Sequence, residues 1–116
     1  MVRIARIYET SGEGEGWRVL VDRLWPRGMK KDAARIDDWM KEIAPSDALR
    51  KWFGHKPERW LEFQKRYRTE LSRKKDLIGQ LREAEKEHGT VTLLFGAKDT
   101  ERNQAVVLRD VLKGKA

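Results

Sequence analysis

The chain has 116 residues, 26 Lys and Arg against 19 Asp and Glu, a formal net charge of +7 and no cysteine. The length predicts one domain over residues 1–116, and the missing cysteine excludes disulfides, thiolate nucleophiles and cysteine metal sites. The two histidines, His55 and His88, lie far apart in the sequence, so we expect neither a metal nor a cofactor. No apolar run approaches the roughly 20 residues of a membrane span, and no signal-peptide pattern is present. We therefore expect a cytoplasmic protein, and its positive charge favours anionic partners.

The first two elements are predicted strands. Residues 2–8 are rich in Ile and Val, and residues 19–21 form a short apolar run with β-branched ends. The connection between them, residues 10–16, is too short for a crossover helix, so the strands are either an antiparallel pair or not neighbours. Three glycines in this connection alternate with glutamates, which would repel a phosphate, and no helix follows. We therefore reject a phosphate-loop interpretation.

The predicted strand at residues 19–24 ends in a mixture of charged and aromatic side chains. Asp22 and Arg23 bring opposite charges to it. Trp25 precedes a proline that cannot donate to a strand ladder, and Arg27 adds a second cation. This mixture is typical of the floor of a binding site. It is equally typical of a strand end held by an Asp22–Arg23 or an Arg27–carboxylate ion pair, and both interpretations stay open here.

Helices are predicted in the middle of the chain. Asp32 is a suitable N-cap, and the apolar residues after it predict an amphipathic helix that ends at Pro45. These apolar residues are Ile36, Trp39, Met40 and Ile43. Ser46 predicts the start of a short helix that ends at Gly54, and Pro57 predicts the first turn of the next helix. We expect Trp39, Trp52 and Trp60 to be largely buried in one aromatic core.

The last third of the chain predicts two helices around a strand. Residues 60–71 and 77–84 carry apolar stripes rotated about 60° from one another, which predicts a break near residues 72–76. Residues 91–95 are continuously apolar and predict a central strand that is buried on both faces. A final helix follows, capped by Asp99 or Thr100. The elements together predict an α/β fold with a small mixed sheet of about three main strands. Helices cover this sheet, and the helical middle segment caps the strand ends.

Blocks that extend over nearly the whole chain match a known pattern. They are residues 21–28 (VDRLWPRG), 44–46, 49–53, 58–60, 63, 67–68, 70–71, 91–94 and 103–108. With these blocks the chain resembles the YeaO-like branch of the domain of unknown function 488 family. The family has no settled activity, so the resemblance implies a fold and motif positions but little mechanism.

The resemblance also gives no support to a covalent mechanism. Other members of the wider family carry a cysteine–histidine–arginine motif after the equivalent strand, which looks like an oxyanion or thiol site. In this chain the corresponding region is Asn103, Gln104 and Ala105. None of these side chains can act as a thiolate nucleophile or an imidazole base.

The ends of the strands at residues 19–24 and 91–95 are the best candidates for a site, because ligands of open α/β sheets bind beyond the carboxyl ends of strands. The helix that follows the second strand would add a positive dipole end. We hypothesise a pocket for a small anionic ligand, a phosphate or a carboxylate. Its candidate binding residues are Arg23, Trp25, Arg27, Lys98, Asp99 and Asn103. The two arginines would clamp the anion, and Trp25 would be a stacking wall.

Whether the protein is an enzyme stays open. Asp22 and His55 are the candidates for a general base, since burial would raise the pKa of the aspartate and His55 lies beside a helix end. A simpler role for His55 is a surface turn or a helix cap. The sequence contains no Ser–His–Asp, paired-carboxylate or metal signature.

Two other classes of function stay open. A basic helix at residues 59–75 could bind nucleic acid through Arg59, Lys65, Arg66 and Arg73. No helix-turn-helix, RNP or zinc-finger pattern accompanies these residues, and such a run is more often a solvated face. The third hypothesis is a protein-interaction module without a pocket.

Overall fold

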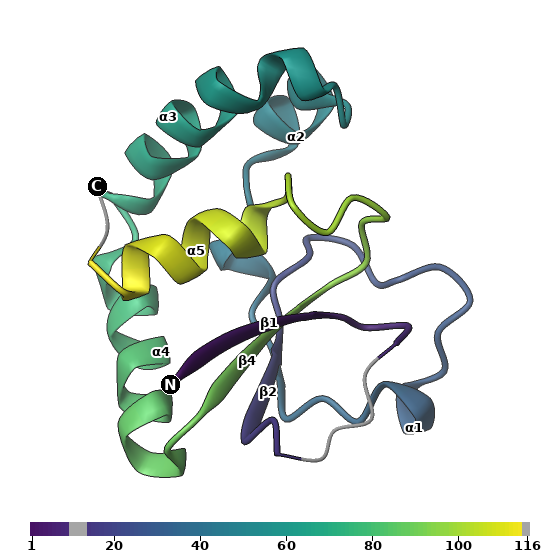
Figure 1. Ribbon diagram of the computed structural model, residues 1–116, viewed down its shortest axis with the longest axis vertical. Coiled ribbons are helices and arrows are strands. Elements are labelled where there is room, and N and C mark those ends of the chain that lie inside the picture. Colours follow the sequence, from purple (N-terminus) through teal and green to yellow (C-terminus); the bar gives the residue numbers. More distant parts are fainter. Residues whose placement is uncertain (10–13, 115–116) are drawn as a thin grey trace.

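The computed structural model describes residues 1–9 and 14–114, so part of the predicted connection, residues 10–13, lies outside the described residues. The sheet (Figure 1) has four strands in the spatial order β1-β4-β2-β3, and each of these pairings is parallel. The strands are β1 (Val2–Arg6), β2 (Trp17–Leu20), β3 (Asp38–Trp39) and β4 (Val91–Phe95). The predicted α/β class is confirmed. The expected mixed sheet of three main strands is instead a parallel sheet with β3 as a short fourth strand.

Strand β4 is central, as its apolar run predicted. Its first residue, Val91, aligns with Val2 of β1 on one side and with Trp17 of β2 on the other. All five residues of β4 are buried. Because β4 separates β1 from β2, the first two strands are not neighbours, which is one of the two arrangements that their short connection allowed.

The main helices are α2 (Asp47–Phe53), α3 (Trp60–Leu71), α4 (Lys75–His88) and α5 (Gln104–Leu112). Most of their ends were predicted correctly. The Ser46 hydroxyl accepts a hydrogen bond from the Leu49 amide at 3.2 Å and begins α2, and Gly54 ends it. Pro57 opens a 3-10 turn that leads into α3, and α3 and α4 are separated within the predicted break. Within the part of the chain that the structure describes, no helix is long and apolar enough to cross a membrane.

The predicted amphipathic helix around residues 36–43 is wrong. The structure has a single helical turn, α1 (Lys31–Ala34), then strand β3 and a 3-10 turn, η1 (Lys41–Ile43). Asp32 lies inside α1 and is not its N-cap, which is Lys30.

The reason for this difference is a long-range contact. Helix α1 stops because Arg35 adopts a left-handed conformation, with a φ of 49°. The Arg18 guanidinium of β2 donates to the carbonyl oxygens of Ala34 and Arg35 at 2.7 and 2.8 Å. These two acceptors are therefore held by β2, and the chain that follows pairs with β2 as β3.

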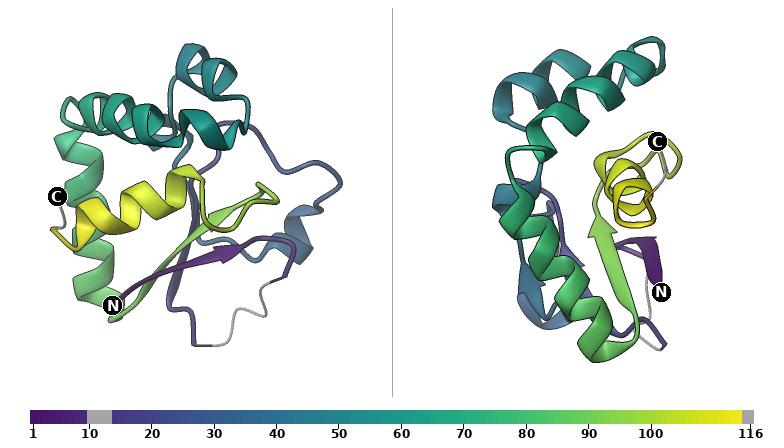
Figure 2. Two further views of the ribbon diagram at one scale, coloured as in Figure 1. Left: turned by 45° about the horizontal axis from the view of Figure 1, so that its top comes forward. Right: turned by 90° about the vertical axis from the view of Figure 1, so that its left-hand side faces the viewer.

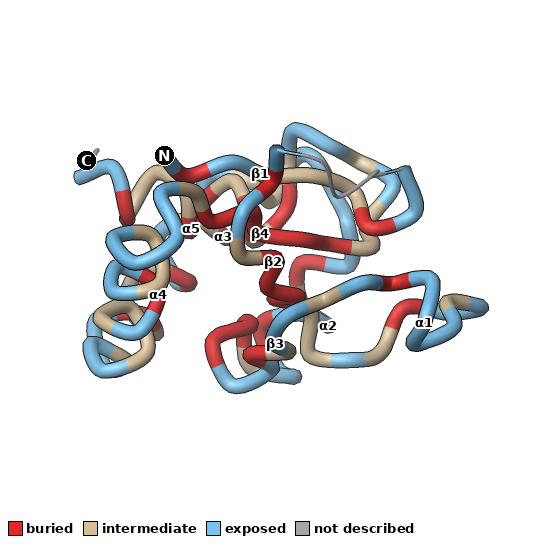
Figure 3. The backbone as a smooth tube through the Cα atoms, turned by 90° about the horizontal axis from the view of Figure 1, so that it is seen from below, coloured by how far each residue is buried: buried red, intermediate tan, exposed pale blue. Residues whose placement is uncertain are grey.

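Side chains cover the sheet on both faces, because successive residues of a strand point to opposite sides. Val91, Leu93 and Phe95 of β4 belong to the larger core cluster, with side chains of α3, α4 and α5. Leu94 and Leu20 belong to a smaller cluster with the segment that contains α1. Figures 2 and 3 show α4 and α1 on opposite sides of the sheet.

The three tryptophans that we expected to be largely buried, Trp39, Trp52 and Trp60, are only half-buried. They pack against the outside of the two clusters. The aromatic side chains that are buried are Phe53, Phe63, Tyr67 and Phe95.

Candidate functional site

A cavity of about 400 Å³ lies where β2 and β4 end. Its walls come from the segment after β2, from the loop between β4 and α5, and from α2 with the turn that follows it. Parallel strands that start together also end together, so the two strand ends meet at one edge of the sheet. The cavity is lined by the predicted residues Arg23, Trp25, Arg27 and Asn103, together with Asp22 and His55. The predicted residues Lys98 and Asp99 are not part of its lining.

Asp22 joins the two strand ends at this cavity. One carboxylate oxygen accepts a hydrogen bond from the Gly96 amide at 2.9 Å, and the other accepts from Gln104 Nε2 at 2.5 Å. A Cβ atom at position 96 would lie 2.9 Å from the Asp22 carboxylate, so the close approach favours glycine there. Both donors follow β4, and the carboxylate therefore fixes the loop between β4 and α5 against the end of β2.

Burial raises the pKa of Asp22 from 3.8 to about 6, although the hydrogen bonds from Gly96 and Gln104 lower it. The loss of hydration disfavours the charged form more than these two donors favour it. Asp22 therefore gains or loses its proton near pH 6, inside a cavity that also contains cationic side chains.

Arg23 is fixed in the cavity wall by two backbone carbonyl groups. Its Nε donates to the Pro45 oxygen at 2.9 Å, and its Nη2 donates to the Ala44 oxygen at 3.1 Å. The side chain is half-buried and lines the cavity. Within residues 1–9 and 14–114, Arg23 has no carboxylate at ion-pair distance and no acceptor for its Nη1.

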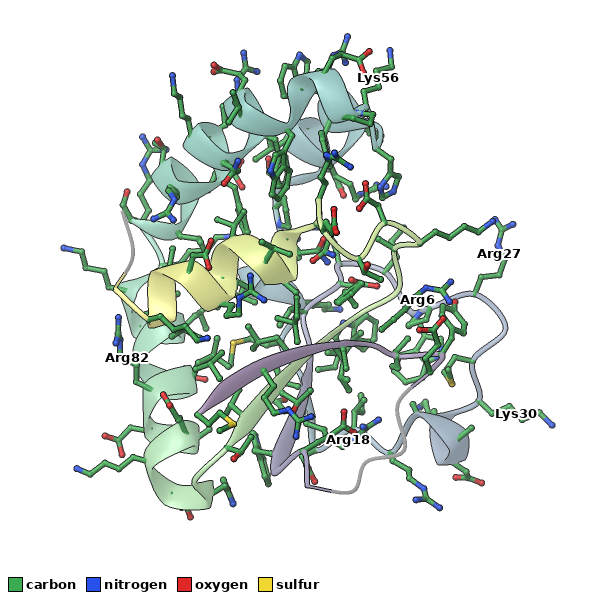
Figure 4. The ribbon with its side chains drawn as sticks, in the orientation of Figure 1. Arg6, Arg18, Arg27, Lys30, Lys56 and Arg82 are labelled. Atoms are coloured by element: carbon green, nitrogen blue, oxygen red, sulfur yellow. The ribbon has the colours of Figure 1, made fainter. Side chains whose placement is uncertain are left out.

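The two ion pairs that we considered for this strand end are absent among the described residues. Asp22 does not pair with Arg23, and Arg27 does not pair with a carboxylate. Figure 4 shows the exposed Arg27 side chain directed away from the body of the protein. The backbone oxygen of Arg27 accepts a hydrogen bond from the Tyr8 hydroxyl at 2.8 Å, which connects the ends of β1 and β2.

Trp25 forms a fixed wall of the cavity. Its indole Nε1 donates to the Met29 oxygen at 2.7 Å, and its ring meets the edge of Trp39 at a centroid distance of 5.3 Å. The ring orientation is therefore set by the protein before any ligand enters.

Asn103 lines the cavity but has a structural role as the N-cap of α5. Its Oδ1 accepts from the Val106 amide at 3.2 Å, and its Nδ2 donates to the Asp99 oxygen at 2.9 Å. The prediction that Asp99 or Thr100 caps this helix is wrong. Asp99 closes the preceding turn, where its pKa is lowered chiefly by a hydrogen bond from the Glu101 amide.

His55 also lines the cavity, at the turn that follows α2. It is one of two non-glycine residues with positive φ in the described chain, with a value of 57°. Histidine is among the residues that tolerate this left-handed region best.

Three further polar residues line the cavity and were not predicted as part of a site: Gln104, Arg50 and Lys51. No local pattern marks the two cations of α2, because only the packing of α2 over the strand ends brings them to the cavity. With them, the described lining contains four Lys and Arg residues and one carboxylate, that of Asp22. The cavity therefore has an excess of positive charge, which suits an anion.

Two of the four cations that we considered for nucleic-acid binding contact the protein itself. The guanidinium groups of Arg59 and Arg66 lie 5.1 and 4.2 Å from the Trp52 ring centroid, and Arg66 pairs with Glu62 at 3.0 Å. Lys65 and Arg73 are exposed. These contacts connect α2 to α3, and the nucleic-acid hypothesis stays a prediction.

Comparison with known proteins places the chain in a family. Residues 1–116 match the family described as the inactive DUF488-N3 subclade. The uncharacterized protein Rv3073c of Mycobacterium tuberculosis is 42% identical over 98% of this chain and 95% of its own length. The uncharacterized protein YeaO of Escherichia coli K12 is 39% identical over 97% of this chain and 96% of its own length. No solved structure matches.

Proposed function

This chain belongs to the DUF488 family, in the subclade described as inactive, and from this premise we propose that it is a binding protein whose cavity holds a small anionic ligand. Arg23 is the observation that carries the proposal. It is half-buried at the cavity wall, two carbonyl groups fix its guanidinium, and no described carboxylate lies at ion-pair distance from it. A bound anion would supply a counter-ion.

The other charged groups of the cavity have supporting roles in this proposal. The exposed side chains of Arg27, Arg50 and Lys51 raise the local concentration of anions through long-range attraction that salt screens. Asp22 holds the two strand ends together, and below about pH 6 its protonated carboxyl becomes a hydrogen-bond donor to the ligand.

Covalent catalysis through a serine, threonine or cysteine nucleophile has no support from the described groups that line the cavity. Among the described lining residues there is no Ser, Thr or Cys. These are the side chains that most often act as nucleophiles after activation by a base. Acid–base chemistry by Asp22 and His55, which share the cavity, stays a prediction.

The test is a titration of the ¹⁵N-labelled protein with acetate, phenylacetate and inorganic phosphate at constant ionic strength, followed by amide chemical shifts. We expect at least one anion to shift the amides of residues 22–25, 27 and 96–104. The substitution Arg23→Met should lower its affinity by about 2–5 kcal/mol, since a partly buried anion then loses its cation. Lys98→Ala, outside the cavity, is the matched control and should leave the affinity unchanged.

A second variant keeps the test informative should Arg23→Met unfold the protein. Arg50→Met with Lys51→Met removes two exposed cations of α2 and should weaken anion binding several-fold without a change of fold. Anion-induced shifts that spread evenly over the surface, with the same affinity in all variants, would overturn the proposal.

A further inference from the structure

We infer that the ligand of this cavity is a compact, free carboxylic acid with an apolar body, and not a phosphate, a small hydrophilic anion or a peptide C-terminus. This inference rests on the proposed function and specifies the chemistry of the ligand. Three features carry it: exposed apolar side chains in the lining of the cavity, aromatic walls that are already fixed, and the Asp22 carboxylate, which repels a doubly charged ligand.

Large apolar side chains are exposed in the lining. Four large hydrophobic residues of the described chain are exposed, namely Met1, Tyr8, Leu24 and Leu61. Two of these four line this one cavity: Tyr8, which is 40% exposed, and Leu24, which is 60% exposed. An apolar group that binds there would remove this surface from water.

The walls are arranged before a ligand binds. The Tyr8 ring is held by the hydrogen bond from its hydroxyl to the Arg27 oxygen and by the Arg6 guanidinium, 4.7 Å from the ring centroid. Phe53 stacks on Phe63 at a centroid distance of 4.3 Å, and both rings line the cavity. Fixed aromatic walls and a volume of about 400 Å³ suit a compact organic molecule.

Arg23 is the one half-buried Lys or Arg of the described lining, and Leu24 follows it directly in the chain. The exposed part of the lining is mixed: it contains Leu24 and Tyr8 as well as the cations of Arg27, Arg50 and Lys51. We expect an acid group at Arg23 to leave its apolar body in reach of Leu24 and Tyr8.

Arg23 keeps donors for an acid group. Its Nε and one Nη2 hydrogen donate to the Pro45 and Ala44 oxygens, so the two Nη1 hydrogens and the second Nη2 hydrogen are left for the anion.

Asp22 disfavours a doubly charged ligand. Its carboxylate lies in the same cavity and repels a dianion about twice as strongly as a monoanion. A monocarboxylate can instead share a hydrogen bond with the protonated form of Asp22, whose pKa burial raises to about 6.

The experiment compares phenylacetate, acetate, phenylacetamide and inorganic phosphate by the same amide titration at pH 6. We expect phenylacetate to bind at least tenfold more tightly than each of the other three. Leu24→Ser should weaken phenylacetate several-fold and leave acetate unchanged. Leu61→Ser is the matched control, because Leu61 is 74% exposed on α3 and outside the cavity, and it should change neither affinity.

The outcomes separate this inference from the proposed function. Arg23-dependent binding of phosphate or acetate that equals that of phenylacetate would overturn the inference and leave the proposed function standing. No Arg23-dependent binding of any of these anions would overturn both. An acetylated tripeptide that ends in phenylalanine serves as a further probe. Tighter binding of this peptide than of phenylacetate would also overturn the inference, since the site would then recognise a peptide C-terminus rather than a free acid.

Discussion

Two arginines near the opposite ends of β2 have different surroundings. Arg18 is 5% exposed, donates to the oxygens of Ala34 and Arg35, and pairs with the buried carboxylate of Glu15 (Figure 4 labels Arg18). Arg23 also donates to two carbonyl groups, but it is half-buried and has no described carboxylate partner. Both arginines fix a later segment of the chain. Arg18 has the Glu15 carboxylate as its counter-ion, whereas Arg23, at the edge of the cavity, has no carboxylate partner among the described residues.

This comparison shows which cations are informative in a chain with 26 Lys and Arg. Charge alone does not mark a binding residue, since Arg59 and Arg66 lie against Trp52 and Arg18 has its own carboxylate. A cation that is partly desolvated and fixed in place, without its counter-ion, is a stronger indication of a ligand.

The largest expected effect on stability comes from a substitution of Arg18, which has Glu15 as its counter-ion. Arg18→Met should lower the free energy of unfolding by about 3–5 kcal/mol, because Glu15 would lose its buried cation and two carbonyl groups would lose donors. Urea unfolding measures this loss. The double variant Arg18→Met with Glu15→Gln should recover part of it, and a single variant within 1 kcal/mol of the parent would show that the pair is not needed.

The second prediction tests whether Asp22 is a hidden counter-ion of Arg23. The pKa of Asp22 is raised from 3.8 to about 6 in the folded protein, so between these values the folded state binds more protons than the unfolded state. The parent should therefore lose up to about 3 kcal/mol of stability as the pH rises from 4 to 7, with no further loss above that from this group.

Urea unfolding at several pH values between 4 and 8 measures this dependence, and Asp22→Asn is the control that should lack it. An Asp22–Arg23 ion pair would lower the pKa of Asp22 and reverse the slope, so that the parent gained stability with rising pH. A stability that rises with pH would show that Asp22 is the counter-ion of Arg23, and Arg23 would then not differ from Arg18 in lacking one.

A smaller effect is expected from Arg23→Lys, which keeps the charge. Lysine lacks the rigid fork that reaches the Pro45 and Ala44 oxygens together, so the variant should lose about 1–2 kcal/mol of stability. Arg27→Lys, at an exposed position, should stay within about 0.5 kcal/mol of the parent. Equal unfolding midpoints for the two variants would show that Arg23 does not hold the segment before α2.

The smallest effect concerns Asn103, which lines the cavity as a helix cap. Asn103→Ala should cost about 1 kcal/mol of stability, and Asn103→Ser should restore most of it, because a serine hydroxyl also caps a helix. Thermal unfolding checks both variants. An alanine variant as stable as the parent would show that the cap bond to Val106 contributes nothing measurable.

Much of this fold could be predicted because local rules determine it. The apolar run of β4 predicted its central place, and Ser46 and Gly54 predicted the ends of α2. The meeting of the two strand ends followed from the general rule for parallel strands, although the parallel direction itself was not predicted.

The rest depended on contacts between residues that are distant in the sequence. The apolar spacing around residues 36–43 fits a helix, but Arg18 holds the carbonyls that such a helix would use. The local sequence also does not determine which residue caps α5. Asp99, Thr100 and Asn103 are all suitable N-caps, and only the structure shows that Asn103 is used. In the same way, Arg50 and Lys51 reach the cavity through the packing of α2, which no local pattern indicates.

The central place of β4 has a consequence for the synthesis of this protein. β1 pairs only with β4, and β2 pairs with β4 and with the two-residue strand β3. Residues 2–6 and 17–20 therefore leave the ribosome long before the strand that joins them, and the sheet cannot assemble until residues 91–95 are present. Such late, non-local pairing slows folding and leaves the strand edges open to other chains in the meantime. The step that completes this sheet thus waits for the translation of residues 91–95.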